Sequence, residues 1–280
     1  MQTKFSLDDK YVLEKGVVYV NGIQALVRLP IEQMKRDRLK GLRTGAFISG
    51  YEGSPLGGYD IALARAGKLL SDHNIHFVPG INEDLAATAV MGSQTYQLIP
   101  ETNTDGVVGI WYGKGPGVDR SGDVLRHANF AGTGKHCGAL VLAGDDHISK
   151  SSTIPHQSEL SFYNCAIPTL HAGNTQEVLD YGLYGIAMSR FSGAWSGLKL
   201  ATDICDGGGT IEVSLERCQI EDPELAFDGQ PYQKVMQPRL IVPYSLQLER
   251  EIHERRLVAA REFARLNKLN EIKVSHTKDR

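Results

Sequence analysis

The sequence predicts an α/β protein built on a doubly wound, mostly parallel sheet with helices on both faces. A strand, a turn and a helix alternate four or five times between residues 25 and 216, which favours parallel strands joined by helical crossovers. The 30 glycines gather in four clusters, where backbone turns sharply or approaches a ligand closely. The composition, 41% hydrophobic and 22% charged over 280 residues, is ordinary for a soluble α/β protein.

Residues 1–24 are expected to form an N-terminal arm with a short hairpin, in which 16–22 is a strand. Residues 23–41 have helical spacing of their apolar side chains, which predicts the first helix. Pro30 lies within this segment and is expected to break or restart the helix, because proline has no backbone N–H to donate.

The remaining strand–helix units of the predicted domain, residues 25–216, follow in order along the chain. We expect strands at 46–49, 75–80, 105–114, 136–146 and 208–216, and helices at 60–71, 83–97, 119–130 and 175–193. Asn174 or Thr175 is the expected N-cap of the last of these helices, with Glu177 in its first turn. In such sheets ligands bind beyond the carboxyl ends of the strands, at the point where strand order reverses.

The periodic pattern of the sequence ends after the last predicted strand. Residues 217–244 contain four prolines and no clear periodicity, so we expect a linker. Residues 245–280 begin as a charged amphipathic helix that presents one apolar face, and we expect it to lead into a truncated next domain. The residues of this face are Leu248, Ile252, Ala259, Phe263 and Leu266.

Charge and composition exclude several classes of function. The net charge of −3 gives no electrostatic reason to expect nucleic-acid binding. No apolar run approaches the roughly 20 residues of a membrane helix, and the N-terminus lacks the apolar segment of a signal peptide, so we expect a cytoplasmic protein. The four cysteines show no C-x-x-C spacing, so free thiols are expected and neither a zinc site nor an iron–sulfur cluster is predicted in this chain.

Two glycine-rich stretches allow either a phosphate cradle or a simple turn. "YEGSPLGGYD" (51–60) follows a predicted buried strand, and neither it nor its neighbours match a P-loop or a G-x-G-x-x-G pattern. "WYGKGPGVDRSGD" (111–123) places Lys114 among glycines, which invites a phosphate, although Gly-Pro-Gly also simply turns a chain. The residues alone do not decide whether either stretch binds a phosphate or simply turns the chain.

The stretch "AGDDHISKSSTIPHQSE" (143–159) is the most polar at a strand end. Asp145, Asp146, His147 and His156 are conceivable metal ligands, but adjacent acids in a loop commonly face water, and no spacing matches a helix-borne metal site. We therefore predict no metal site in this chain. The absence of a G-x-S-x-G pattern argues against a serine hydrolase.

Two carboxylates open the otherwise alanine-rich helix predicted at 83–97. Asn82 is the expected N-cap, and Glu83 and Asp84 complement the positive end of the helix dipole. Capping explains a negative charge at this position. It does not explain why one of the two acids is a glutamate.

Four segments together carry a resemblance. "YEGSPLGGYD", "NEDLAATAVMGSQ", "GKGPG" and "DDHISKSSTIPHQSE", in this order and each at a predicted strand end, resemble the pyrimidine-binding domain of thiamine-diphosphate-dependent 2-oxoacid:ferredoxin oxidoreductases. Within that family the chain looks most like the N-terminal part of the fused indolepyruvate:ferredoxin oxidoreductases. The resemblance covers residues 25–215, and the segment around Glu83 is its most specific part.

The resemblance implies a catalytic role for Glu83. In the family, a glutamate hydrogen-bonds N1′ of the cofactor's aminopyrimidine and so promotes loss of the thiazolium C2 proton, a task that needs a carboxyl group held in a dry site. Asp84 would then be the capping acid. The residues implied to bind the cofactor are Gly53, Ser54, Pro55, Glu83, Gly115, Pro116 and Gly117.

The resemblance also points to a substrate region. Ser54 takes the place of a family threonine near cofactor and substrate, and the loop 151–157 corresponds to the place where relatives contact the substrate's carboxylate. Relatives often use arginine there, whereas this chain has His156 and Gln157. The residues implied to contact substrate are Ser54, Ser152, Thr153, His156 and Gln157.

The family's diphosphate half is not found in this chain. It uses Gly-Asp-Gly and a later asparagine to hold Mg²⁺ and the diphosphate; Gly144-Asp145-Asp146 with Asn174 imitates that spacing, but Asp146 would repel a diphosphate. We read this match as a decoy. The diphosphate-binding domain, Mg²⁺, the iron–sulfur clusters and the coenzyme A site are therefore expected outside these residues.

These observations lead to one expectation of function and two alternatives. We expect part of an oxidoreductase that decarboxylates a 2-oxoacid, such as indolepyruvate, to an acyl-CoA with ferredoxin as acceptor, inactive as this fragment alone and working in a homo-oligomer. One alternative is a non-catalytic interaction module with the same fold. The other is a nucleotide- or phosphate-binding enzyme that uses the loops at 53–58 and 113–117.

Overall fold

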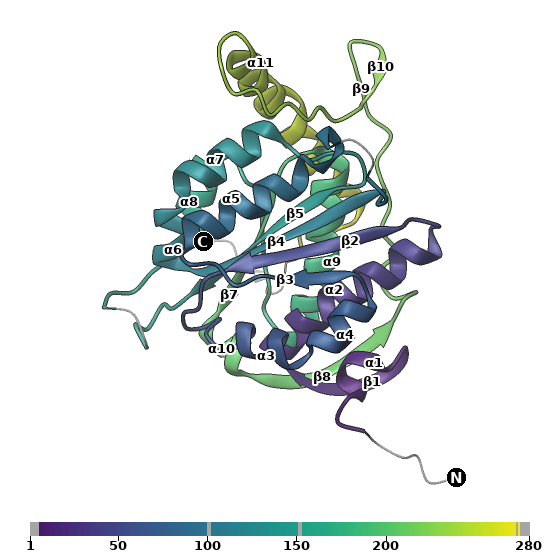
Figure 1. Cartoon of the computed structure of the whole chain (residues 1–280), viewed down its shortest axis with the longest axis vertical. Helices are drawn as coiled ribbons and strands as arrows, with labels where there is room; N and C mark the ends of the chain where they lie inside the picture. The colour runs from purple at the N-terminus through teal and green to yellow at the C-terminus, as the bar shows by residue number, and fades with distance from the viewer. Residues whose placement is uncertain (1–5, 100–101, 151–152, 273, 275–280) are drawn as a thin grey trace.

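The computed structural model describes residues 6–99, 102–150, 153–272 and 274. Its centre is a sheet of six parallel strands in the order β3-β2-β4-β5-β7-β6 (Figure 1). The strands are β2 (Thr44–Gly50), β3 (Ile75–Phe77), β4 (Gly106–Lys114), β5 (Gly138–Asp145), β6 (Thr169–His171) and β7 (Ser196–Ala201). The predicted doubly wound parallel sheet is confirmed.

Strand order reverses between β2 and β4. From β2 the chain passes outward to β3 and then returns to β4 on the other side of β2, from which it winds away through β5 toward β7 and β6. The carboxyl ends of β2 and β4 are therefore neighbours from which the chain leaves in different directions. In doubly wound sheets, ligands bind in the crevice at such a point, outside the carboxyl ends of the strands.

Helices cover both faces of the sheet, and alternate strand residues point to each. One core lies under α2 (Gly22–Leu39), α3 (Tyr59–Arg65), α4 (Gly67–Asp72) and α9 (Thr175–Ser192), and includes Ile110 and Tyr112 of β4. The other lies under α5 (Glu83–Gln94), α6 (Gly115–Arg120), α7 (Gly122–Ala131) and α8 (Glu159–Asn164), and includes Trp111. This period-two alternation is that of a strand buried on both sides.

Helix α2 runs unbroken through Pro30, so the predicted break there is wrong. Proline removes the N–H that would bond the carbonyl four residues earlier, which here belongs to Leu26. The Tyr59 hydroxyl donates to that carbonyl oxygen at 3.3 Å, and Tyr59 is fully buried. A side chain from α3 thus supplies the donor that Pro30 lacks, which lets the helix continue inside the core.

Replacing Tyr59 with Phe should therefore destabilise the fold by about 1 kcal/mol, the net value of one buried hydrogen bond. The same change made on a Pro30→Ala background should cost less, because an alanine at this position would restore a backbone donor for the Leu26 carbonyl. Urea unfolding of the four proteins in this double-mutant cycle measures the coupling. Equal costs on both backgrounds would contradict the assignment of Tyr59 as the replacement donor.

Three further elements differ from expectation. The strand β1 (Lys15–Asn21) forms no local hairpin; it pairs antiparallel with β8 (Gly208–Ser214), which is therefore not part of the central sheet. The predicted helix at 60–71 is two short helices, α3 and α4. The Gly-Pro-Gly after β4 is the first turn of α6 rather than a loop, since proline is compatible with a helix's first turn.

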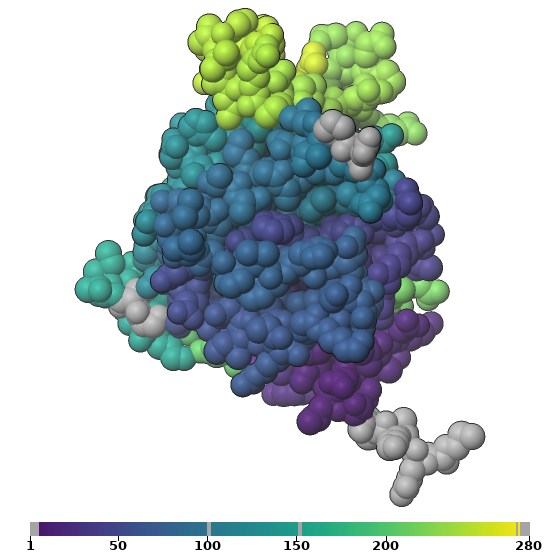
Figure 2. Space-filling view, in the orientation of Figure 1, coloured from purple at the N-terminus to yellow at the C-terminus, as the bar shows by residue number. Residues whose placement is uncertain are grey.

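The remaining short elements are α1 (Asp9–Val12), a 3-10 turn at Tyr96–Leu98 and α10 (Thr202–Asp206). The C-terminal segment contains the hairpin β9 (Ala226–Phe227) and β10 (Gln230–Pro231), then α11 (Tyr244–Glu251), a π-helical turn (Ile252–Arg256) and α12 (Leu257–Leu266). Figure 2 shows part of this segment, in yellow-green, raised above the main body.

Buried cations attach the C-terminal segment to the domain. Arg256 is fully buried and donates to the carbonyl oxygens of Asn129 and Phe130, in the last turn of α7, and of Val235. Cations are favoured at this end of a helix, where carbonyl groups lack partners. Phe263 of α12 stacks on Phe191 of α9, with ring centroids 6.1 Å apart. The amphipathic helix thus buries its apolar face on the domain.

Candidate functional site

The loops after β2 and β4 meet at the crevice where strand order reverses. Lys114, the last residue of β4, lays its side chain across Gly53: a methyl group on Gly53 would lie 2.9 Å from Lys114 Cδ. At the end of β5, a methyl group on Gly144 would lie 2.9 Å from Pro55 Cδ. Small residues at these positions therefore let three strand-end segments approach one another.

Glu83 is held at this crevice by the start of α5. The Asn82 side chain accepts a hydrogen bond from the Leu85 N–H at 2.9 Å, so Asn82 is the N-cap, as predicted. The Trp111 indole N–H donates to the backbone carbonyl oxygen of Glu83 at 3.0 Å, and Trp111 is fully buried. A rigid group of the central strand β4 thus sets the position of the first helical residue.

The side chain of Glu83 lies against Gly117. Glu83 is only 8% exposed, and a methyl group on Gly117 would lie 2.7 Å from Glu83 Cγ and 2.9 Å from Oε1. No residue that the structure describes donates a hydrogen bond to the Glu83 carboxyl group. The Glu83 residue is thus nearly buried, while its carboxyl group has no described partner and is available to a ligand.

The neighbouring acid is used differently. Asp84 accepts from the Arg120 guanidinium at 3.2 Å and lies 3.4 Å from the Ser121 hydroxyl, and it is more exposed than Glu83. The two adjacent carboxylates therefore have separate tasks. Asp84 ties α5 to α6 and to the start of α7, whereas Glu83 lies against Gly117.

His156 packs against the other end of the Gly-Pro-Gly turn. A methyl group on Gly115 would overlap the His156 ring, and His156 Nε2 lies 2.7 Å from Asp119 Oδ2. Partial burial works to raise the pKa of Asp119, but the hydrogen bonds from His156 and Ser161 outweigh it and lower that pKa below its usual value. The dyad of Asp119 and His156 supports the turn that carries Gly117.

Asp145 is part of the scaffold. It is fully buried and accepts hydrogen bonds from the Ser158 N–H at 2.8 Å and the Ser158 hydroxyl at 2.6 Å. The Lys199 ammonium lies 3.6 Å from Asp145 Oδ2 and forms a close ion pair with Glu159. Asn174, the other half of the decoy pattern, caps α9 by accepting from the Glu177 N–H.

The structure brings most of the sequence-predicted residues together but leaves part of the substrate set apart. Ser54 is half-buried and Pro55 is buried beside the end of β5. Thr153 and Gln157 are exposed on the loop after β5, and Ser152 lies outside the described residues. Sequence reasoning missed Trp111 and Lys199, although a lysine within the apolar strand "SGLKLA" was a detectable signal.

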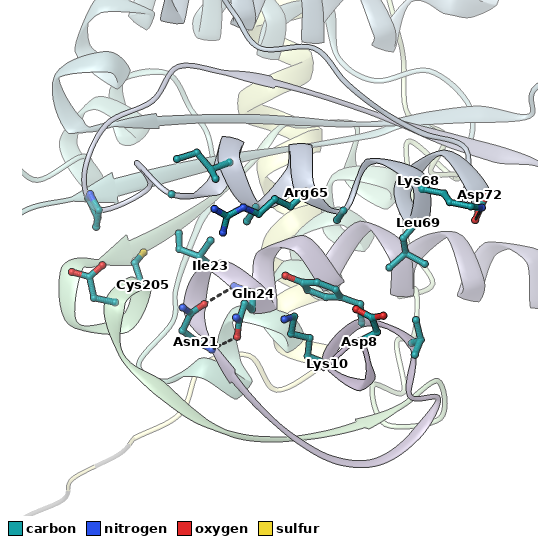
Figure 3. A pocket seen from close by; sticks show the side chains of 18 residues that line it. Asp8, Lys10, Asn21, Ile23, Gln24, Arg65, Lys68, Leu69, Asp72 and Cys205 are labelled. Carbon is teal, nitrogen blue, oxygen red and sulfur yellow. Dashed lines mark hydrogen bonds and ion pairs between the residues drawn. The ribbon is translucent and has the colours of Figure 1, made fainter. Parts of the chain in front are cut away.

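A separate groove of about 880 Å³ lies between α1, α2, α3 and α4. Figure 3 shows Arg65 reaching over Ile23, with the mutual hydrogen bonds of Asn21 and Gln24 at the start of α2. Among the described residues proposed for cofactor or substrate, only Pro55 lines this groove. It is therefore distinct from the crevice at Glu83.

No helix in the described part of the chain is long and apolar enough to span a membrane. Within the same residues, no group of three or more histidine, cysteine, aspartate or glutamate side chains is arranged to hold a metal ion.

Comparison with known proteins defines the fold. No protein-family model matches the sequence, and no curated protein matches it. Among solved structures, it is similar to the 2-oxoglutarate:ferredoxin oxidoreductase from Magnetococcus marinus with 2-oxoglutarate, coenzyme A and succinyl-CoA bound, with a TM-score of 0.60 and 16% sequence identity. The chain has the fold of part of that enzyme. The match covers 89% of this chain and 46% of the other, so the chain spans less than half of that enzyme's length.

Proposed function

We propose that this chain is the pyrimidine-binding part of a thiamine-diphosphate-dependent enzyme that oxidatively decarboxylates a 2-oxoacid to an acyl-CoA, with ferredoxin as the electron acceptor. The observation that carries this proposal is the Glu83 carboxyl group. It belongs to a nearly buried residue, lies against Gly117 at the point where strand order reverses, and receives no hydrogen bond from the described residues. The fold shared with part of a 2-oxoacid:ferredoxin oxidoreductase supports the same reaction class.

The residues around Glu83 fit an aminopyrimidine. Glycines at positions 53, 115 and 117 let the side chains of Lys114, His156 and Glu83 lie directly against the backbone. A flat heteroaromatic ring needs close backbone approach on its faces and a polar partner at its edge. Gly53–Pro55 and Gly115–Gly117 would contact the ring, and Glu83 would hydrogen-bond N1′.

Thiamine diphosphate, when bound, supplies the carbon nucleophile and the electron sink that decarboxylation of a 2-oxoacid requires. The chain's own contribution is to hold Glu83 at N1′ in a site with little water. The Trp111 hydrogen bond and the Asn82 cap fix the start of α5, so Glu83 does not have to be ordered during the reaction. A carboxyl group placed in this way holds or releases a proton at one ring nitrogen.

Exposed apolar side chains flank Glu83 and support the presence of a covering domain. Ile81 is 82% exposed, Leu85 53% and Val78 50%, all within eight residues of one another. Such a group on a soluble protein is typical of an interaction surface. We assign to it a diphosphate-binding domain, located in further residues or another subunit, which would bring Mg²⁺, while the iron–sulfur clusters and the coenzyme A site lie elsewhere in a homo-oligomeric cytoplasmic enzyme.

The proposal is tested on the complete protein isolated from its source. Bound thiamine diphosphate and iron are assayed on one sample, and reduction of ferredoxin is followed with indolepyruvate, pyruvate or 2-oxoglutarate in the presence of coenzyme A. We expect bound cofactor, iron and 2-oxoacid-dependent reduction, with an aryl pyruvate preferred. A protein with neither cofactor nor iron that reduces no acceptor would overturn the proposal and favour an interaction module.

A further inference from the structure

Lys114 reaches from β4 toward the loop after β2. Its side chain runs across Gly53: relative to a methyl group placed on Gly53, Lys114 Cβ lies at 3.5 Å, Cγ at 3.1 Å and Cδ at 2.9 Å. Successive carbons therefore come closer to Gly53 as the side chain extends. Lys114 is half-buried along the loop that carries Ser54, and two residues separate it from Gly117, the contact of Glu83.

Three other cations at this edge of the sheet are matched to carboxylates. Arg120 pairs with Asp84, Lys150 with Asp206, and Lys199 with Glu159 and Asp145. Lys114 forms no ion pair or hydrogen bond with any described residue. Its ammonium group is therefore available to a ligand.

The predicted arginine substitute, His156, is poorly placed to supply this charge. Its Nε2 is 2.7 Å from the Asp119 carboxylate and its ring is packed against Gly115. Any positive charge on His156 would be matched by Asp119 and by Asp145, whose Oδ1 is 3.9 Å from His156 Nδ1. A substrate anion at the crevice would gain little from a cation that is already paired twice.

We propose that Lys114 binds the carboxylate of the substrate and so selects anionic 2-oxoacids. This inference rests on the proposed function and names a residue for one part of it. An ammonium group forms charge-assisted hydrogen bonds with a carboxylate. Lys114 directly precedes the Gly-Pro-Gly turn that contacts Glu83, and its side chain lies on Gly53, next to Ser54. Gly53 is the position that leaves room for its stem.

The test measures binding in the complete cofactor-loaded enzyme with two unreactive probes. These are 3-phenyllactate, which carries a carboxylate, and 3-phenyllactamide, which has the same shape without the charge; both carry a hydroxyl in place of the ketone group that the cofactor would attack. We expect the wild-type enzyme to bind the acid at least about tenfold more tightly than the amide. The Lys114→Met enzyme should bind both equally, and Lys114→Arg should restore the preference.

Lys150→Met is the matched control, since Lys150 is a lysine of the same edge that is already paired with Asp206. It should retain the preference for the acid. Retention of that preference in Lys114→Met would overturn the inference, as would a wild-type enzyme that turns over 2-oxoacids but does not distinguish the two probes. A wild-type enzyme that turns over no 2-oxoacid would instead overturn the proposed function itself, and the inference with it.

Discussion

Replacing Glu83 with Gln in the complete enzyme is expected to lower turnover by roughly two to four orders of magnitude, the usual contribution of a positioned acid–base group. Glutamine preserves the volume of the side chain but cannot exchange a proton with the pyrimidine nitrogen. Stability should be nearly unchanged, because no described residue forms a hydrogen bond or ion pair with the Glu83 carboxyl group that the substitution would break. Steady-state kinetics and thermal unfolding on the same preparation measure the two effects.

Asp84→Asn is the matched control for this prediction. Asp84 is the adjacent residue of the same helical turn, but its carboxylate faces Arg120 and Ser121. Its loss should cost little turnover and at most about 1 kcal/mol of stability, the range of an exposed ion pair. If Asp84→Asn lowered turnover as much as Glu83→Gln does, the prediction that Glu83 alone of the two acids acts in the reaction would be wrong.

A second control changes Gly117, the residue against which the Glu83 side chain lies. Gly117→Ala would place a methyl group 2.7 Å from Glu83 Cγ and should displace the carboxyl group, so turnover should fall although Glu83 is still present. Gly122→Ala is the comparison, since a methyl group there meets nothing within 4 Å. It should leave turnover unchanged.

The second large effect expected is a dependence of stability on pH that arises from Lys234. The Lys234 ammonium donates to the Thr133 hydroxyl and to the Cys137 carbonyl oxygen, each at 3.0 Å. Burial, assisted by the positive charges of Arg190 and Arg256, lowers the pKa of Lys234 to about 7. In the unfolded chain the pKa of a lysine is about 10.4.

Between these two pKa values the unfolded chain holds a proton that the folded protein has released. Stability should therefore rise as pH increases from about 7 to about 10, by up to about 1.4 kcal/mol per pH unit from this group. Below pH 7 both states are protonated and above about pH 10.4 both are neutral, so the contribution of Lys234 no longer changes. This rise of stability with pH is the reverse of the change expected for a lysine that is paired with a carboxylate in the folded protein.

Urea unfolding of wild-type protein and of Lys234→Met between about pH 6 and 10 isolates this contribution, because burial also raises the pKa of the nearby Cys137 thiol. The slope of the free energy of unfolding against pH should be smaller in Lys234→Met by up to the amount given above. Lys135→Met, at an exposed lysine of the adjacent loop, should keep the wild-type slope. Parallel curves for wild type and Lys234→Met would refute the prediction.

Local patterns in the sequence were sufficient to predict the fold class, the parallel strands and the cap at Asn82. They depend on apolar runs, glycines after strands and a side-chain acceptor three residues from its donor, which are all properties of neighbouring residues. The same patterns failed at Pro30, where Tyr59 from a different helix supplies the missing donor. They failed again at β1, whose partner β8 lies nearly 200 residues away.

The candidate site likewise combines features that the sequence predicted with features that only the tertiary structure decided. The resemblance carried by four segments marked Glu83 and assigned capping to Asp84, and clustered glycines marked the two glycine-rich segments. Only the tertiary structure gave Asp84 its partners Arg120 and Ser121, buried Asp145 as a hydrogen-bond acceptor for Ser158, and left Lys114 without a carboxylate partner among the described residues. Pairing of charges and burial are decided by residues distant in the chain, so which ionisable group is satisfied and which faces a ligand follows from the packed fold rather than from local sequence.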